Sequence, residues 1–166
     1  MAITRRVFYS FHYKPDSWRV SKIRNIGAIA ENKPVHDNDW ETIKGNEAKI
    51  ERWIQDQLYG RSCTVVLIGG NTAGRKWINY EIKESWKKGM GVLGVHIHNL
   101  TDHTGNFCSR GANPFSGLVV NGVSLGSVVV AHDPWVFLGS SADYRNHIAA
   151  NLDGYIEQAI TIRRQH

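Results

Sequence analysis

Three short, mainly apolar segments occur along the chain, at residues 6–11, 63–68 and 92–97, and the middle one is a continuous apolar run. Runs of this length predict strands that are covered on both faces, as in the centre of a parallel sheet. The first run, RVFYSF, is also rich in the aromatic and β-branched residues that favour strands.

Other segments carry apolar residues at every third or fourth position, which predicts helices with one buried face. A first helix, capped by Asp16 or Ser17, is expected to continue through Ile26 and to stop at Gly27. Further helices are predicted at residues 46–58, 76–88 and 142–163.

The C-terminal third begins with a less regular stretch. Residues 100–117 are rich in glycine and asparagine and predict a long loop. Short strands are then predicted at residues 118–120, 128–131 and 135–138.

Strands that alternate with helices are typical of α/β proteins, in which right-handed crossovers build a mainly parallel sheet between two helical layers. We therefore expect a flavodoxin-like, three-layer fold that forms one domain over residues 1–166. Ligands bind such sheets beyond the carboxyl ends of the strands, so residues 10–13 and 69–75 are expected at the functional edge.

Composition narrows the class of protein without identifying it. No apolar run approaches the roughly 20 residues that span a bilayer, and no signal peptide is visible, so the cytoplasm is the expected location. The formal net charge is +5, but the basic residues are scattered and no nucleic-acid motif is present. A solvated basic surface is the simpler interpretation, and neither nucleic acid nor a membrane is expected as a partner.

Three patterns resemble ligand sites without meeting their requirements. The glycine spacing at residues 89–94 matches a dinucleotide fingerprint, but it leaves a helix and enters a strand, the reverse of what that site needs. Residues 69–74 have phosphate-loop spacing but lack the following Lys and Ser/Thr. His96 and His98 share one side of a strand without an evident third ligand, so no metal site is expected.

One carboxylate lies on the apolar side of its predicted helix. At about 100° per residue, Glu81 falls roughly 40° from Trp77 and on the same side as Ile78, whereas Glu84 lies on the opposite half. A carboxylate among apolar residues costs free energy unless it is compensated. Two alternatives stay open on this geometry: a functional residue at the ligand edge, or a structural glutamate that pairs with an arginine or caps a loop.

Several segments together resemble TIR domains, and in particular the TIR-like ThsB proteins of the Thoeris antiphage defence system. The opening strand is typical of TIR domains. The strongest likeness is SCTVVLIG at 62–69, then Asn71-Thr72, then RKWINYEI at 75–82. Further segments of the same pattern occur at residues 24–27, 37–41, 53–54 and 111–115.

This resemblance implies a function. Catalytic TIR domains carry an essential glutamate in a Trp-x-x-x-Glu element, which here runs from Trp77 to Glu81. The implied activity is that of an NAD glycohydrolase or ADP-ribosyl cyclase, with NAD as substrate, no cofactor, and a cyclic ADP-ribose isomer that signals to a partner effector. The candidate substrate-binding residues are Phe8, Ser10, Phe11, Asp37, Asp39, Arg75 and Trp77, and Arg24 is a further candidate for the pyrophosphate.

Two other functions remain as alternatives. A non-catalytic TIR-like scaffold or adaptor would act by protein association, and it predicts that Glu81→Gln keeps full activity. A flavodoxin-like FMN carrier is disfavoured because the first strand lacks a Ser/Thr-rich phosphate loop. The oligomeric state stays open, and a homo-oligomer is compatible with the sequence.

Overall fold

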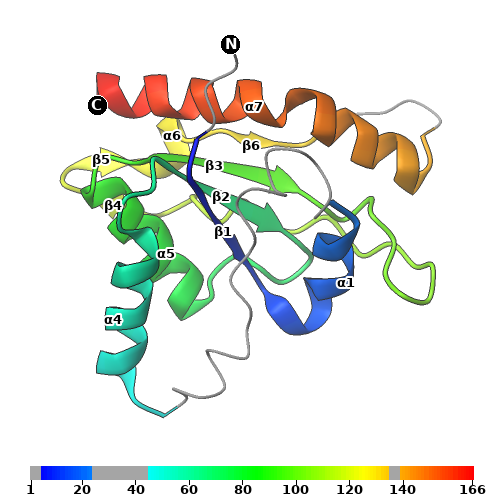
Figure 1. Ribbon diagram of the computed structural model, residues 1–166, viewed down its shortest axis with the longest axis horizontal. Helices are drawn as coiled ribbons and strands as arrows, with labels where there is room; N and C mark the ends of the chain where they lie inside the picture. Colours follow the sequence, from blue (N-terminus) through cyan, green and yellow to red (C-terminus); the bar gives the residue numbers. More distant parts are fainter. Residues whose placement is uncertain (1–4, 24–44, 135–138) are drawn as a thin grey trace.

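The structure is a computed structural model that describes residues 5–23, 45–134 and 139–166 (Figure 1). A four-stranded parallel sheet lies at its centre in the order β1-β2-β3-β6. Its strands are β1 (Val7–Phe11), β2 (Cys63–Ile68), β3 (Gly91–His96) and β6 (Ala131–His132). Because all four run in one direction, their carboxyl ends meet at one edge of the sheet.

Helices cover both faces of this sheet. One face packs against α1 (Tyr13–Ile23) and α7 (Ser141–Gln165), whereas α5 (Lys76–Lys87) covers the other face, with α4 (Glu47–Leu58) beside it (Figure 1). This arrangement confirms the predicted α/β fold with a mainly parallel central sheet. In the part of the chain that the structure describes, no helix is long and apolar enough to cross a membrane.

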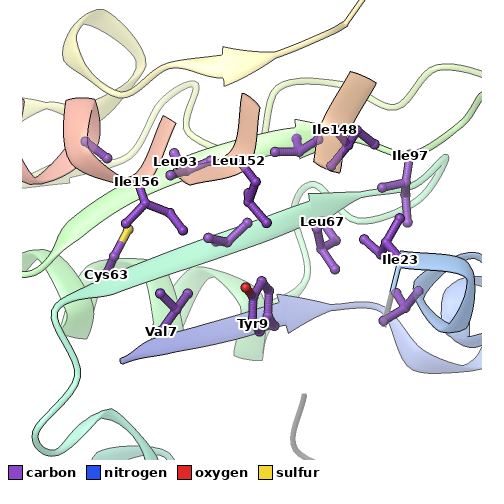
Figure 2. Close-up of a cluster of buried hydrophobic side chains, with 14 of the residues drawn as sticks. Val7, Tyr9, Ile23, Cys63, Leu67, Leu93, Ile97, Ile148, Leu152 and Ile156 are labelled. Atoms are coloured by element: carbon purple, nitrogen blue, oxygen red, sulfur yellow. The ribbon is translucent and has the colours of Figure 1, made fainter. Parts of the chain in front are cut away.

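The α7 face of the sheet is closed by aliphatic side chains (Figure 2). Ile148, Leu152 and Ile156 recur along α7 at helical spacing and pack on residues of all three long strands. Gly91 permits this close contact, since a Cβ atom there would lie 2.8 Å from the backbone nitrogen of Ile160.

The α5 face is built from two further clusters. Val66, Ile68 and Val92 pack against Ile82 and Trp86 of α5. Nearer the outer strand, Phe8 packs with the apolar side of α4, formed by Ile50, Ile54 and Leu58. The spacing that predicted these two helices therefore corresponds to their buried sides.

The C-terminal third differs from its prediction in one strand. Leu118–Val120 forms half of a hairpin, β4 (Val119–Val120) with β5 (Val123–Ser124), outside the main sheet. The predicted strand at residues 128–131 is wrong over most of its length, because α6 (Leu125–Val128) occupies its start and β6 begins only at Ala131. Residues 135–138 lie outside the described residues.

The valines at 128–130 favour a strand by propensity, but packing decides otherwise. Leu125 and Val129 are both buried in the cluster beneath α5, and the Val129 N–H donates to the Leu125 carbonyl at 2.9 Å. One helical turn is the geometry that lets residues four apart face the same core.

The first helix also differs from its prediction. It begins at Tyr13, so neither Asp16 nor Ser17 caps it. Asp16 lies in the first turn and is buried, beside Arg19 of the same helix and against Gly69 after β2, and the second of these contacts is a tertiary one that the local capping rule does not anticipate. The predicted end of this helix, at Ile26 and Gly27, lies outside the described residues.

Candidate functional site

A cleft of about 870 Å³ opens at the carboxyl end of β1. Three segments form its walls: the end of β1 with the start of α1, the start of α4, and the loop after β2 with the first half of α5. This is the edge at which parallel sheets bind ligands, and it agrees with the expectation for residues 10–13 and 69–75.

Glu81 reaches this cleft from the buried side of α5. Its side chain is only 4% exposed, yet it belongs to the cleft lining. The predicted placement on the helix is confirmed, since Ile78 and Ile82 are buried with it while Lys76 and Lys87 are exposed. A carboxylate at this position can meet a ligand and is shielded from bulk water.

Ser10 lies next to Glu81 and donates a hydrogen bond from its Oγ to the Glu81 Oε2. Side chains alternate along β1, so that Val7 and Tyr9 join the core beneath α7 while Phe8 and Ser10 face the α5 side. The hydroxyl is therefore directed at the carboxylate by the strand itself.

Aromatic side chains line the part of the cleft between α4 and α5. Phe8, Trp53 and Trp77 all belong to its lining. Trp77 also contacts the Tyr80 ring edge-on, with 5.7 Å between ring centroids, and Gln55 of α4 donates to the Tyr80 hydroxyl at 3.1 Å. These contacts join the two helices and form a surface suited to flat rings.

Basic residues gather at the rim of the cleft. Lys14, Arg75 and Lys76 are exposed there, and Lys76 pairs with Glu47 on the opposite wall. His12 also lines the cleft; partial burial and the nearby Arg75 charge lower the pKa of its imidazole, which favours the neutral form near pH 7. The rim can attract an anionic group and the interior can receive aromatic rings.

Comparisons with known proteins agree with this geometry. Residues 8–102 match the family model described as "Thoeris protein ThsB, TIR-like domain". The chain belongs to this ThsB family.

A curated relative of this family member is the "Putative cyclic ADP-D-ribose synthase ThsB1" of Bacillus cereus (strain MSX-D12). The two are 38% identical over 122 residues, which are 70% of this chain and 64% of the relative. The chain thus spans slightly less than two thirds of the relative's length.

The residues predicted from the sequence come together in part. In this ThsB family member, Phe8, Phe11, Arg75, Trp77 and Glu81 all line the cleft. Ser10 is instead hydrogen-bonded to Glu81. The remaining candidates, Arg24, Asp37 and Asp39, lie outside the described residues.

Several lining residues of the ThsB cleft were not among the candidates from the sequence, and His12, Lys14 and Trp53 are examples. Trp53 shares a helix side with Ile50 and Ile54, so its periodicity matches that of a core residue. His12 and Lys14 follow the first strand at the expected ligand edge, and that position was the available signal.

The histidine pair at the end of β3 lies elsewhere in the ThsB fold. The His96 and His98 rings are 5.7 Å apart, and burial lowers the pKa of His96 to about 4. Within the described ranges, no group of three or more His, Cys, Asp or Glu side chains is arranged to hold a metal ion.

Proposed function

We propose that this ThsB family member cleaves NAD between nicotinamide and ribose and forms a cyclic ADP-ribose isomer, with Glu81 as the catalytic carboxylate. The observation that carries the proposal is a carboxylate, 4% exposed, in the lining of a cleft large enough for a dinucleotide. The printed name of the Bacillus cereus relative, a cyclic ADP-D-ribose synthase, supports the same reaction.

A single carboxylate suits this chemistry. When the glycosidic bond breaks, its electron pair moves to the pyridinium nitrogen and nicotinamide leaves as a neutral molecule, so no acid is needed to protonate it. The ribose develops oxocarbenium character, which a nearby anion stabilises. Glu81 faces this positive carbon and accepts hydrogen bonds from the ribose hydroxyls.

The second half of the reaction depends on which nucleophile reaches the ribose. If water is excluded, the adenine or a ribose hydroxyl of the same molecule attacks C1′, and a cyclic isomer and a proton are released. The enclosed position of Glu81 and the aromatic side chains of Phe8, Trp53 and Trp77 favour this intramolecular route over hydrolysis.

The proposal also assigns a role to the basic rim of the cleft and to the cyclic product. Arg75 at the start of α5 meets the pyrophosphate of NAD, which a guanidinium and a helix N-terminus both favour. The cyclic product then carries the signal to an effector protein of the defence system. NAD enters as substrate, and the cytoplasmic location and the absence of a cofactor stay predictions from the sequence.

The test follows NAD and its products by mass spectrometry in lysates of phage-infected cells that contain the wild type or Glu81→Gln. The wild type should convert NAD into a product with the mass of a cyclic ADP-ribose. Glu81→Gln should lower the rate at least about 100-fold, because the amide cannot supply the negative charge.

Glu84→Gln is the matched control. Glu84 lies on the same helix but bonds to Lys87 at 3.0 Å and Gln55 at 3.0 Å, away from the cleft. This control should retain the wild-type rate. Equal product from Glu81→Gln and the wild type would instead favour the scaffold or adaptor function.

A further inference from the structure

We infer that Ser10 is a positioning residue, which acts by holding the Glu81 carboxylate in its reactive orientation rather than by contacting the substrate. The inference rests on the proposed function of Glu81. The direct observation is the hydrogen bond from the Ser10 hydroxyl to Glu81 Oε2, between side chains that are 1% and 4% exposed.

Apolar packing alone does not explain a serine at position 10. It lies within β1 between buried apolar residues, and a buried hydroxyl costs free energy unless it is hydrogen-bonded. Its acceptor is an acidic side chain, and hydrogen bonds to ionised groups are shorter and stronger than those between neutral groups. The strand therefore carries a polar residue where its partner is the proposed catalytic carboxylate.

A second pair of buried hydroxyls, Thr64 and Ser85, lies nearby, and of the two Ser85 is the one that contacts Glu81, through its backbone. Ser85 donates to the carbonyl oxygen of Glu81 at 2.6 Å, and its Oγ lies 2.7 Å from Thr64 Oγ1 on β2. Thr64 and Ser85 are both fully buried. Thr64 contacts Ser85 and not the Glu81 side chain, so it is a matched buried hydroxyl on the neighbouring strand, whereas Ser10 contacts the carboxylate itself.

Because of this arrangement, a change at Ser10 should affect the orientation of the Glu81 carboxylate and not the binding of substrate in the cleft. Ser10 is absent from the cleft lining that the described residues form, so its loss should leave the cleft walls intact. Without the hydroxyl, the carboxylate loses the contact that orients its Oε2, and small errors in the placement of a reacting group lower rates strongly. The predicted signature is a lower kcat with an unchanged KM.

The experiment compares three variants with the wild type under conditions in which the wild type turns over NAD. Ser10→Ala should lower kcat about 10- to 100-fold with KM within about 2-fold of the wild type. The thiol of Ser10→Cys is a weaker donor, so the kcat of this variant should lie between those of the wild type and Ser10→Ala. Thr64→Val removes a neighbouring hydroxyl that does not contact the carboxylate, and its kcat should stay within about 3-fold of the wild type.

An infrared measurement gives a readout that does not require turnover. The carboxylate stretching band of Glu81 is the band that disappears in Glu81→Gln. It should shift in Ser10→Ala, because a hydrogen bond to Oε2 is lost, and stay in place in Thr64→Val. Thermal unfolding of each variant checks that the protein is folded under the conditions of the infrared and kinetic measurements.

The outcomes distinguish the two proposals. Wild-type rates in Glu81→Gln would overturn the proposed function, whereas an unshifted band in Ser10→Ala would overturn the positioning role with or without activity. A raised KM at unchanged kcat would make Ser10 a substrate contact instead. Equal losses of kcat in Ser10→Ala and Thr64→Val would show that Ser10 contributes only to packing, which would overturn the positioning role.

Discussion

Two buried carboxylates lie at the same edge of the sheet and have different surroundings. Asp16 of α1 is 1% exposed and Glu81 of α5 is 4% exposed. Asp16 lies so close to the end of β2 that a Cβ atom on Gly69 would be 2.1 Å from its Oδ2. Glu81 instead accepts a hydrogen bond from Ser10 and faces the cleft. Burial alone therefore does not distinguish Glu81, the proposed catalytic carboxylate, from Asp16.

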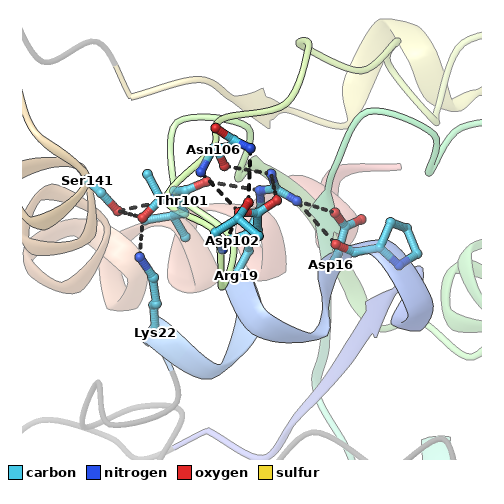
Figure 3. Close-up of polar contacts among 10 residues, drawn as sticks. Asp16, Arg19, Lys22, Thr101, Asp102, Asn106 and Ser141 are labelled. Carbon is cyan, nitrogen blue, oxygen red and sulfur yellow. Dashed lines mark hydrogen bonds and ion pairs between the residues drawn. The ribbon is translucent and has the colours of Figure 1, made fainter.

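Arg19 is the charged residue that lies next to Asp16 (Figure 3). The Arg19 Nη1 lies 3.6 Å from the Asp16 Oδ1, and the same guanidinium donates to the backbone oxygens of Leu100 at 2.9 Å and Asn106 at 3.0 Å. Burial raises the pKa of Asp16 to about 6, and Arg19 partly offsets this shift. These contacts join α1 to the loop that follows β3, which is a structural role.

The comparison shows what makes a buried carboxylate available for chemistry. The Arg19 guanidinium offsets part of the cost of burying the Asp16 carboxylate, and Asp16 packs directly against Gly69. Ser10 donates a hydrogen bond to Glu81, and the Glu81 side chain borders the cleft. Access to the cleft, more than burial, is the feature that supports the proposed role of Glu81.

The largest predicted effect on stability comes from Arg19→Met, which removes the cation from a buried site. The variant should lose about 3–5 kcal/mol of unfolding free energy, because Asp16 and two loop carbonyls lose their partner. Chemical denaturation measures the loss. Arg110→Met, at an exposed pair with Asp133, should cost no more than about 1 kcal/mol. Similar losses in both variants would contradict the structural role of Arg19.

A smaller effect is predicted for Asp16→Asn, and it depends on pH. The folded-state pKa of Asp16, about 6, lies above its ordinary value of 3.8, so the protonated form stabilises the fold. That contribution is complete below pH 3.8 and is lost as the pH rises through about 6. Compared with Asp16→Asn, the wild type should therefore lose on the order of 2 kcal/mol of unfolding free energy as the pH rises from 4 to 7.5. Denaturation at the two pH values measures this difference, and a constant difference would contradict the account.

The smallest predicted effect concerns the rim of the cleft. Arg75→Ala should raise the KM for NAD about 3- to 10-fold at low salt with little change in kcat, because an exposed charge contributes to binding and not to the chemical step. Initial rates at two ionic strengths measure the effect, which should shrink at high salt. Lys88→Ala, at the far end of α5, is the control. A lower kcat at unchanged KM would show that Arg75 takes part in the reaction.

The sequence predicted the structural elements well where local pattern and packing agree. The bounds of β2 were predicted correctly, and the helical periodicity of α5 placed Glu81 among its buried residues. A continuous apolar run and a one-sided helix are both consequences of burial, so the pattern alone was sufficient.

The remaining features depend on contacts between distant parts of the chain. Ser10 and Glu81 are 71 positions apart, and no local pattern relates them. Asp16 has the residue type of a helix cap, but it lies inside the first turn of α1 and packs against Gly69 in the loop after β2. Trp53 follows the spacing of core residues and nevertheless lines the cleft. In each case tertiary packing determined the outcome.

The most direct test of the account measures two properties of two matched variants, Glu81→Gln and Asp16→Asn, each of which replaces a buried carboxylate with an amide. Nicotinamide release from NAD should be lost in Glu81→Gln and retained in Asp16→Asn, while the pH dependence of unfolding should change in Asp16→Asn. Retained release in Glu81→Gln, or equal loss of release in both variants while they remain folded, would contradict the central claim that Glu81 carries the chemistry.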